Sequence, residues 1–323
     1  MNQPIPPWDA IVIGGGPAGL SAATWLARYR RKVLVLDSEQ HRNRDVVEGH
    51  GYFGLGDFSP AELLEQGRKH VSAYPTAELR RARVATARTH GTERFTLTLD
   101  DGDELHARRL VLATGVRDEL PDIPGFVEHY GASAFHCPTC DGYEAREQRV
   151  LVVGWSELVA GFALNLLDWA RTVTVVTDGR RFEGDDEQRW VLAEEGVELL
   201  EDEVVELVGV RGALEGARLR GGRAVDCELV FFTIAHNQSS DLADQLGCQR
   251  SPENDCVVVD ENNETSVAGV YAAGDMTPGM QLVQIAAAKG ATAGITCAQS
   301  IRGEPPAPGA PEPGPDPAVA EQS

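Results

Sequence analysis

The sequence predicts an α/β fold of two domains, each with three layers of the ββα type, the second inserted in the first. A β-branched strand, a glycine turn and a helix follow one another from Asp9, and the same order returns from Arg149. A further strand of this kind, at 269–273, then resumes the first pattern. Alternating strands and helices are typical of parallel sheets whose faces are covered by other elements.

The expected domain boundaries follow these patterns. The first domain covers 1–118 and returns over 251–302, and the central domain covers 119–250. A chain of 323 residues is long enough for about two domains. Residues 303–323 are rich in proline, alanine, glycine and glutamate, so they have too little apolar surface to order themselves and are expected to form a disordered tail.

Charge and hydropathy argue against two classes of partner. The formal net charge of -21 repels phosphate backbones, so we expect no nucleic acid to bind. No apolar run approaches the ~20 residues of a membrane span, so we expect no membrane partner. Residues 1–10 lack the cationic start and the apolar stretch of a signal peptide, which predicts a cytoplasmic protein.

The first glycine motif predicts a dinucleotide site. Gly14 permits a tight turn, Gly16 lets the backbone approach a pyrophosphate, and Gly19 allows close packing of the helix that follows. Asp37 ends the next strand, at the roughly 20-residue distance where an acidic side chain holds ribose hydroxyls. Strand, glycines, helix, strand and acid together indicate a Rossmann-like dinucleotide-binding domain, and the second pattern predicts another.

Shorter elements fill the rest of the first domain. A glycine-dense loop over 48–56, which contains His50, suggests backbone close to a ligand, and a helix is expected over 59–74. Three short strands are expected at 84–87, 95–99 and 104–107. A separate buried strand from Arg109 ends in the small-residue turn 113–115, of the kind that crosses over a bound cofactor.

Two cysteines, Cys137 and Cys140, are separated only by Pro-Thr. Such a pair can close a small disulfide where the chain enters a helix, and a helix N-terminus favours the thiolate. Half of a zinc site is the alternative, but the remaining cysteines stand singly. We therefore predict a two-electron switch and no metal. Buried apolar positions are expected for Cys227, Cys248, Cys256 and Cys297.

The order of these motifs resembles that of the low-molecular-weight thioredoxin reductase family over about residues 9–301. The resemblance rests on Gly-Gly-Gly-Pro-Ala-Gly at 14–19, Ala-Thr-Gly at 113–115, Cys-Pro-Thr-Cys-Asp-Gly at 137–142, Gly-Asp at 274–275, and Gln284. It implies a homodimeric enzyme with non-covalent FAD, whose cysteine pair lies in the nicotinamide domain.

The resemblance also implies roles for individual residues. Cys140 faces the flavin, and Cys137 exchanges with the substrate disulfide. Asp141 is the general acid or base for the thiolate next to the flavin, with a mere helix-cap carboxylate as the alternative. The residues expected to bind FAD are Gly14, Gly16, Pro17, Ala18, Gly19, Asp37, His50, Val84, Ala113, Thr114, Gly115, Gly274, Asp275 and Gln284.

The second glycine motif departs from the family pattern. The strand expected at 149–153 is followed by Gly-Trp-Ser-Glu. Ser156 therefore replaces a glycine, and Glu157 puts negative charge where a pyrophosphate would lie. Asp178 stands where relatives that use NADPH carry basic residues for its 2′-phosphate, although the arginines at 180–181 could still reach it. NAD(P)H binding is therefore doubtful.

The elements after this motif are expected from their composition. Strands are expected at 171–176, 194–200, 204–210, 214–219 and 228–234. Helices are expected at 157–170 and 286–300, with Gln284 just before the second of them.

A second branch of the family matches the degenerate nicotinamide motif. Flavin-dependent dithiol oxidases, including those that close the disulfides of dithiolopyrrolone and epidithio compounds, resemble thioredoxin reductases that have lost the nicotinamide site. Their segment leading into the cysteine pair resembles 113–144 of this chain. Many of them carry histidine after the second cysteine, where this chain has Asp141.

Three functions follow from these observations. The first is an FAD-dependent thiol-disulfide oxidoreductase that takes electrons from a small dithiol and passes them to the flavin, then to oxygen or another acceptor. The second is an NAD(P)H-dependent reductase of thioredoxin or a similar small protein disulfide. The third is a non-catalytic flavin-binding redox sensor. The degenerate nicotinamide site favours the first, whereas Asp141 in place of the histidine of many dithiol oxidases favours the second. The retained cysteine pair argues against the third.

Overall fold

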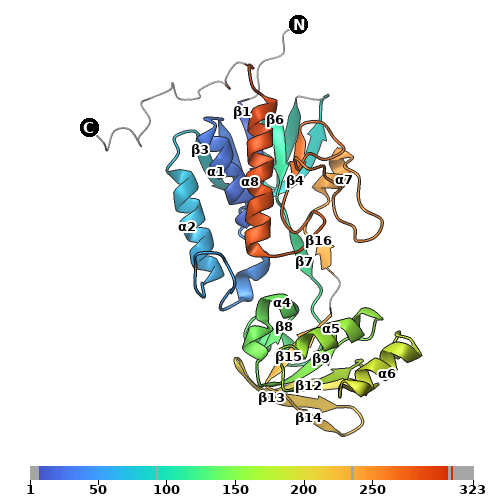
Figure 1. Cartoon of the computed structure of the whole chain (residues 1–323). Coiled ribbons are helices and arrows are strands. Elements are labelled where there is room, and N and C mark those ends of the chain that lie inside the picture. Colours follow the sequence, from blue (N-terminus) through green and yellow to red (C-terminus); the bar gives the residue numbers. More distant parts are fainter. Residues whose placement is uncertain (1–6, 92–93, 234–235, 305–306, 308–323) are drawn as a thin grey trace. The chain divides into compact units, whose positions relative to one another are not determined.

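The computed structural model describes residues 7–91, 94–233, 236–304 and 307 (Figure 1). The chain forms two compact units. Unit 1 comprises Met1–Arg42, Ala61–Arg117 and Asn237–Ser323, and unit 2 comprises Asn43–Pro60 and Asp118–His236. Unit 2 is therefore inserted in unit 1. The tail expected at 303–323 lies outside the described residues, apart from 303, 304 and 307.

The units divide the chain differently from the expected domains mainly in two segments, and Asp118 also falls in unit 2. Segment 43–60 belongs to unit 2, where the Val47 N–H donates to the Gly131 carbonyl at 3.1 Å. Residues 237–250 belong to unit 1, because helix α7 (Leu242–Leu246) buries its apolar side chains in the core of that unit.

Unit 1 contains a seven-stranded sheet in the order β3-β2-β1-β6-β5-β4, with β17 also paired to β6. Its strands are β1 (Trp8–Ile13), β2 (Val33–Asp37), β3 (Ala77–Arg81), β4 (Val84–Thr89), β5 (Phe95–Leu99), β6 (Glu104–Leu112) and β17 (Val270–Ala272). The pairs β1–β2, β2–β3, β1–β6 and β6–β17 are parallel, whereas β4, β5 and β6 form an antiparallel meander. β6 pairs with β5 through 104–107 and with β17 through 110–112.

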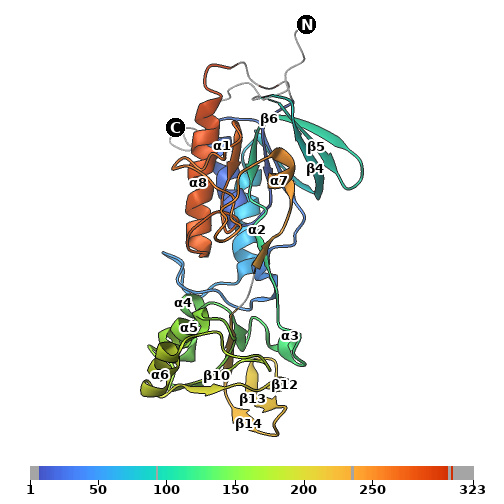
Figure 2. The same ribbon diagram turned by 90° about the vertical axis from the view of Figure 1, so that its right-hand side faces the viewer.

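Side chains of β1 alternate between two cores, one on each face of the sheet. The long helices of unit 1 are α1 (Pro17–Arg28), α2 (Pro60–Ser72) and α8 (Val283–Ser300). Ala10 and Val12 join the core beneath these helices, whereas Ile11 and Ile13 join the core on the other face. Figure 2 shows α1 and α8 on one side and the β4–β5 hairpin on the other. Burial of both faces explains why β1 is a continuous apolar run.

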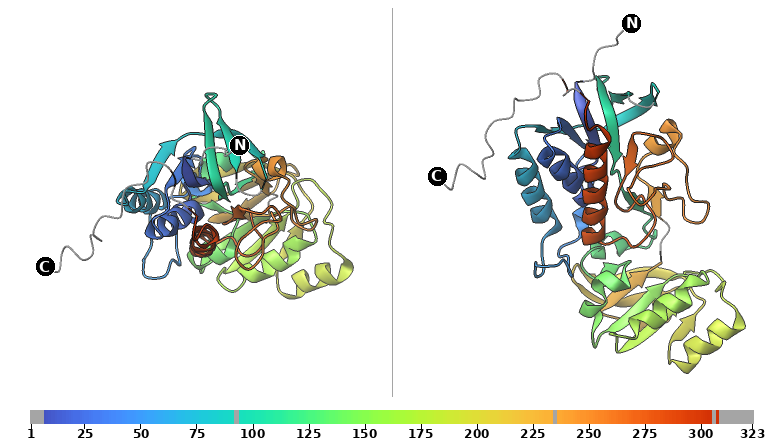
Figure 3. Two further views of the ribbon diagram at one scale, coloured as in Figure 1. Left: turned by 90° about the horizontal axis from the view of Figure 1, so that it is seen from above. Right: turned by 45° about the horizontal axis from the view of Figure 1, so that its top comes forward.

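Two glycines allow α8 to lie directly against α1. A Cβ atom added at Gly290 would stand 2.0 Å from the Ala18 carbonyl oxygen, and one added at Gly294 would stand 2.4 Å from that of Ala22. Only glycine permits such an approach of one helix to the backbone of another. The two helices are seen side by side in the left view of Figure 3. The contact holds α1, whose N-terminus follows the first glycine turn.

Unit 2 repeats the three-layer plan around a parallel sheet in the order β11-β10-β9-β15-β8. Its strands are β8 (Ala134–Phe135), β9 (Arg149–Val153), β10 (Thr172–Val176), β11 (Glu198–Leu200) and β15 (Leu229–Phe232). Helices α5 (Leu158–Leu166) and α6 (Asp186–Glu194) cover one face. The other face is covered by an antiparallel sheet of β12 (Val204–Val210), β13 (Ala213–Leu219) and β14 (Ala224–Asp226).

Short elements complete the chain. They are β7 (Val116–Asp118) and β16 (His236–Gln238), which pair with each other, the helices α3 (Phe126–His129) and α4 (Pro138–Asp141), and the 3-10 turns η1 (Arg42–Asp45) and η2 (Tyr143–Ala145). Within the described ranges, no helix combines the length and the apolar composition that crossing a membrane requires.

Most of the sequence-based elements are present, but they differ from the expectation at several places. Strand β3 was not expected, and the strand expected at 194–200 is only β11, because Glu194 still belongs to helix α6. The strands expected at 104–107 and from Arg109 are one continuous strand, β6. Its first half pairs with β5 and its second half with β17. Helix α6 was not expected, although Asp185 and Gln188 form a capping box at its start. Helix α5 ends at Leu166 and α8 begins at Val283, so the first is shorter and the second longer than expected.

Gly290→Ala is expected to lower the free energy of unfolding by about 1–3 kcal/mol, because its methyl group would overlap the Ala18 carbonyl. Gly161→Ala in α5 is the matched control. Nothing lies within 4 Å of a Cβ added there, so alanine should stabilise the chain by about 0.5–1 kcal/mol. Denaturant unfolding measures both effects. Equal stability of Gly290→Ala and the unmodified chain would contradict the close helix contact.

Candidate functional site

The first glycine turn folds against the end of β6. At Gly14, where φ is +113°, an added Cβ would stand 2.2 Å from the Ala113 carbonyl oxygen. At Gly19, an added Cβ would stand 1.8 Å from the Gly14 carbonyl oxygen. Packing therefore requires glycine at both positions. At Gly16, by contrast, an added Cβ meets nothing within 4 Å, so this part of the turn borders open space.

Helix α1 begins at this turn without a side-chain cap. Gly16 is the N-cap residue, and Pro17 occupies the first helical position, where an N–H is not needed. Ala18 follows with only a methyl group. An N-terminus of this kind, with its backbone N–H groups and its helix dipole, favours a phosphate group.

Asp37 ends β2 beside the same turn. Its Oδ2 accepts a hydrogen bond from Arg68 at 3.1 Å, and its Oδ1 accepts one from the Glu39 N–H at 2.8 Å. A Cβ added at Gly15 would stand 2.1 Å from Oδ2 of Asp37. The structure thus brings the acid and the glycine turn into contact, although neither Arg68 nor Gly15 was singled out from the sequence.

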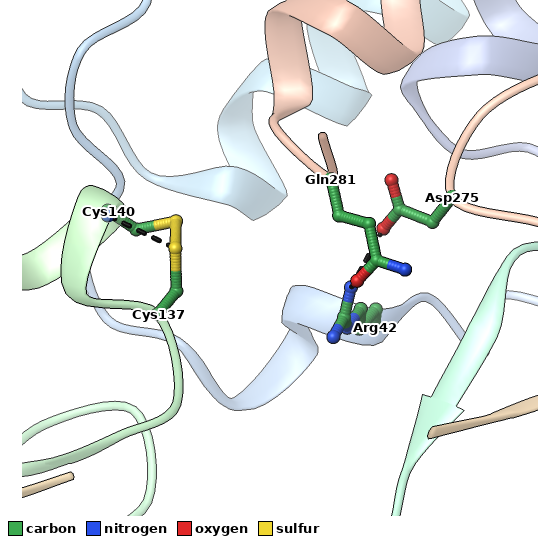
Figure 4. The surroundings of a disulfide bond; sticks show 5 residues. All are labelled: Arg42, Cys137, Cys140, Asp275 and Gln281. Carbon is green, nitrogen blue, oxygen red and sulfur yellow. Dashed lines mark hydrogen bonds and ion pairs between the residues drawn. A yellow bond between two sulfur atoms is a disulfide. The ribbon is translucent and has the colours of Figure 1, made fainter. Parts of the chain in front are cut away.

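A second carboxylate follows β17 in the same unit. Gly274, with φ of +86°, turns the chain so closely past α1 that an added Cβ would stand 2.9 Å from Cβ of Ala18. Asp275 comes next. Figure 4 shows it beside Arg42, which donates to Oδ2 of Asp275 at 3.0 Å and to Oε1 of Gln281 at 2.7 Å. Sequence reasoning missed this ion pair, because its partners are far apart in the chain.

The remaining expected residues of unit 1 have varied surroundings. The Val84 side chain is buried in the core, so only its backbone could reach a ligand. The Thr114 hydroxyl lies 3.6 Å from the Met276 sulfur, and the Gly115 carbonyl accepts a hydrogen bond from a backbone N–H. Gln284 is exposed and lies in the first turn of α8, not before the helix as expected.

The residues of unit 1 fit FAD. The open side of Gly16 and the N-terminus of α1 suit a pyrophosphate, because no atom of the described residues lies within 4 Å of a Cβ added at Gly16. Carboxylates of Asp37 and Asp275 are acceptors of the kind that bind the hydroxyls of a ribose and of a ribityl chain.

Cys137 and Cys140 are joined by a disulfide at the start of α4 in unit 2. Cys137 is the N-cap residue, and its sulfur accepts a hydrogen bond from the Cys140 N–H at 3.1 Å, drawn as a dashed line in Figure 4. Pro138 takes the first helical position. The two cysteines thus form the bond that the predicted two-electron switch would open and close, and the switch itself stays a prediction.

Asp141 directly follows the pair and ends α4. Burial raises the pKa of its carboxyl to about 7, while the charge of His50 opposes this rise and that of Glu144 adds to it. A carboxyl whose pKa lies near neutral pH can both give and take a proton there. This pKa suits the general acid or base that the family resemblance implies for Asp141, a role that stays a prediction.

His50, which the sequence assigned to the cofactor, lies in unit 2. Its Nδ1 is 2.8 Å from Oδ1 of Asp57 and 3.9 Å from Oε1 of Glu144. Burial lowers the pKa of this imidazole, but the Asp57 hydrogen bond and the charges of Glu144, Asp57 and Asp141 together raise it above its ordinary value. Sequence reasoning missed this cluster, because Asp57 and Glu144 belong to segments far apart in the chain.

The other cysteines are buried, as predicted: Cys227, Cys248, Cys256 and Cys297. Burial raises the pKa of all four thiols, to about 12 for Cys227 and Cys297. A buried thiol with a raised pKa is a poor nucleophile. The reactive sulfur chemistry of the described chain therefore centres on the 137–140 pair.

The turn after β9 holds a cation stacked on an indole. The guanidinium carbon of Arg180 lies 3.9 Å from the ring centre of Trp155, which follows Gly154. The Trp155 carbonyl accepts a hydrogen bond from the Glu183 N–H at 2.8 Å. Backbone and ring of Trp155 are thus both held by the segment that follows β10.

Two carboxylates lie near the same turn. Glu157 is the N-cap residue of α5 but makes no capping hydrogen bond with its side chain. Asp178 has a φ of +51°, and its Oδ1 accepts a hydrogen bond from the Val204 N–H at 3.2 Å. A negative charge at a helix N-terminus opposes the binding of an anion there.

Comparisons with known proteins agree on one family. Residues 8–290 match the family described as pyridine nucleotide-disulphide oxidoreductase. A protein named thioredoxin reductase tcpT, from Claviceps purpurea, is 32% identical over 289 residues, which are 83% of this chain and 86% of that protein. The crystal structure of a putative thioredoxin reductase TrxB from Bacillus anthracis has 28% identity and a TM-score of 0.85, covering 91% of this chain and 98% of that one. The crystal structure of HlmI has 36% identity and a TM-score of 0.86, covering 93% of each chain.

Gly16→Val is expected to fold normally but to weaken FAD binding by at least about tenfold, or 1.4 kcal/mol. The reason is that a Cβ added at Gly16 meets nothing within 4 Å, so a side chain there enters the space expected to hold a pyrophosphate. Titration of the apoprotein with FAD measures the affinity, with circular dichroism to confirm the fold and Gly161→Ala as the control. Full affinity in Gly16→Val would contradict this placement of the cofactor.

Asp141→Asn is expected to stabilise the chain more at about pH 8 than at about pH 5. The folded state holds the Asp141 proton up to a pKa of about 7, whereas the ordinary value is 3.8. The stability that this proton contributes is therefore fully present below the unfolded-state pKa of 3.8. It is lost as the pH rises through the folded-state pKa of about 7. Thermal unfolding of both proteins at the two pH values tests this. A difference in Tm that does not change with pH would contradict the raised pKa.

Proposed function

The chain belongs to the pyridine nucleotide-disulphide oxidoreductase family, and from this premise we propose that it is an FAD-dependent dithiol oxidase. It is an oxidoreductase related to thioredoxin reductases, and a flavin is the cofactor that this family implies. In the proposed reaction the disulfide of Cys137 and Cys140 takes two electrons from a dithiol substrate. The net reaction converts a dithiol and dioxygen into a disulfide and hydrogen peroxide.

The observation that carries this direction is the turn after β9. Arg180, a candidate for holding the 2′-phosphate of NADPH, is stacked on Trp155, and the adjoining helix begins at the carboxylate of Glu157. An incoming nucleotide would have to break the stack and place its pyrophosphate beside a negative charge. Both costs disfavour delivery of hydride from NADPH, so electrons would enter through the cysteines.

The thiol steps balance without a further reactant. A substrate thiolate attacks the sulfur of Cys137, the Cys137–Cys140 bond breaks, and Cys140 leaves as a thiolate. The second substrate thiol loses its proton and attacks the substrate sulfur of the mixed disulfide. The substrate disulfide then forms, and Cys137 leaves as a thiolate. Two electrons have reached the pair, and the two substrate protons are released.

Asp141 controls charge at the leaving sulfur. An ionised Asp141 would repel the thiolate that forms on Cys140, whereas the neutral acid can give it a proton. With a pKa of about 7, the carboxyl is present in both forms near neutral pH. FAD bound in unit 1 would supply the two-electron acceptor that passes the electrons on to dioxygen.

An NAD(P)H-dependent reductase of thioredoxin or a similar small protein disulfide is the alternative, and the names of the relatives favour it. In that case Arg180 would leave Trp155 and take the 2′-phosphate, and the electrons would flow in the opposite direction. The homodimer and the cytoplasmic location expected from the sequence stay predictions.

We expect dithiothreitol to bleach the flavin of the anaerobic holoprotein at least about tenfold faster than NADPH or NADH, a difference of 1.4 kcal/mol in barrier height. The reason is that the thiol route uses the intact pair, whereas the nicotinamide route needs the Trp155–Arg180 stack to open. Stopped-flow absorbance measures the rates, and oxygen uptake with peroxide formation measures turnover.

Two variants test the route. Cys140→Ser should keep FAD but lose thiol-dependent bleaching, whereas Cys227→Ser, at a buried cysteine, should keep both. Rapid stoichiometric bleaching by NADPH would overturn the oxidase in favour of the reductase. Thiol-dependent turnover that persists in Cys140→Ser would refute the assigned pair.

A further inference from the structure

A short bridge in the backbone holds His50 and Asp57 side by side. The Gly49 N–H donates to the Phe58 carbonyl at 2.8 Å, and the Phe58 N–H donates to the Gly49 carbonyl at 3.0 Å. His50 and Asp57 are the residues just inside this bridge, and Nδ1 of the one is 2.8 Å from Oδ1 of the other. The geometry orients the imidazole as a carboxylate orients a catalytic histidine.

The base of this loop is anchored within unit 2. The Val47 N–H donates to the Gly131 carbonyl at 3.1 Å, and Arg211 donates to the Asp45 carbonyl at 2.9 Å. The His50 side chain is only 18% exposed, so water screens its charge less than it would screen an exposed group.

His50 faces acidic groups of the segment that directly follows the second cysteine. Oε1 of Glu144, on η2, is 3.9 Å from Nδ1, and Asp141, on α4, also interacts electrostatically with the imidazole. Oε2 of Glu144 is buried and has no hydrogen-bond partner among the described residues. Three carboxylates, those of Asp57, Glu144 and Asp141, therefore favour the positively charged form of His50.

We propose that His50 is a positioning residue for the chemistry of the cysteine pair: its imidazolium, held by Asp57 and Glu144, sets the protonation of Asp141 beside Cys140. This inference rests on the proposed function, which makes Asp141 the proton carrier of the exchange. The imidazolium offsets the burial of Asp141 and the charge of Glu144, so that the Asp141 proton can leave near neutral pH. Without the imidazolium, Asp141 would stay protonated to higher pH. Near neutral pH it could then give a proton but not take one.

The test is a titration of Asp141 in the oxidised holoprotein by infrared spectroscopy. The signal is the protonated-carboxyl stretch that disappears in Asp141→Asn. In the unmodified protein we expect a midpoint at about pH 7. In His50→Gln, which keeps a hydrogen-bonding side chain but no charge, the midpoint should rise by about one unit. In His50→Lys, which keeps a positive charge, it should return toward the unmodified value.

A matched control and a second variant make the result specific. His106→Gln removes an exposed histidine of strand β6 in unit 1 and should leave the midpoint unchanged. Asp57→Asn weakens the hold on the imidazolium and should move the midpoint in the same direction as His50→Gln. This second variant tests the inference even if His50→Gln does not fold. Flavin content and circular dichroism report folding for each variant.

A functional readout accompanies the titration. We take the rate of anaerobic flavin bleaching by dithiothreitol in each protein and divide it by the rate in Asp141→Asn at the same pH. The ionisation of the dithiol affects both rates equally, so the ratio does not depend on it. This ratio should fall as the pH rises through the Asp141 midpoint, and the fall should move to higher pH in His50→Gln.

The outcomes separate the two proposals. An unchanged midpoint in a folded His50→Gln, with thiol-dependent bleaching intact, would overturn the role of His50 and leave the oxidase standing. Absence of thiol-dependent bleaching in the unmodified holoprotein would refute the oxidase and, with it, the function assigned to His50. A raised midpoint that His50→Lys restores would support the inference.

Discussion

Contact between backbone atoms without intervening side chains is the constraint on which unit 1 depends. Gly14 passes the end of β6, Gly19 passes Gly14, and Gly290 lets α8 touch the backbone of α1. A single methyl group at any of these glycines would force the elements apart. Helix α1 is thus held on two sides, and its N-terminus stays beside both turns that carry the carboxylates expected to bind FAD. The site expected to bind FAD is a consequence of this packing.

The cysteine pair depends on electrostatics more than on packing. Four buried thiols elsewhere in the described chain have raised pKa values, whereas the pair lies at the start of a short helix and is followed by Asp141, whose pKa is about 7. Asp141 and His50 shift each other in opposite senses, since the imidazolium stabilises the carboxylate and the carboxylate stabilises the imidazolium. In the proposed reaction, such mutual tuning would keep a proton available at the place where a thiolate forms and disappears.

Both units have the same three-layer architecture, yet their glycine turns differ in chemistry. The turn in unit 1 leaves Gly16 bordering open space, whereas the turn in unit 2 carries a Trp155–Arg180 stack and is followed by an acidic N-cap residue, Glu157. Parallel sheets and their cores tolerate this change, because the turn residues contribute little to the buried core. A fold of this kind can therefore persist while the residues of one of its two glycine turns change.

Local signals in the sequence predicted the fold class, most strands and the cysteine pair, because β-branched runs, glycine turns and the C-x-x-C spacing act within a few residues. Those signals could not assign 43–60 to unit 2, nor find the Arg42–Asp275 ion pair or the carboxylates around His50. By itself, then, the sequence determined which residues can carry redox and cofactor chemistry. The tertiary structure alone decided which charges surround them, since partners such as His50 and Glu144 meet only after the intervening chain has folded into its sheets.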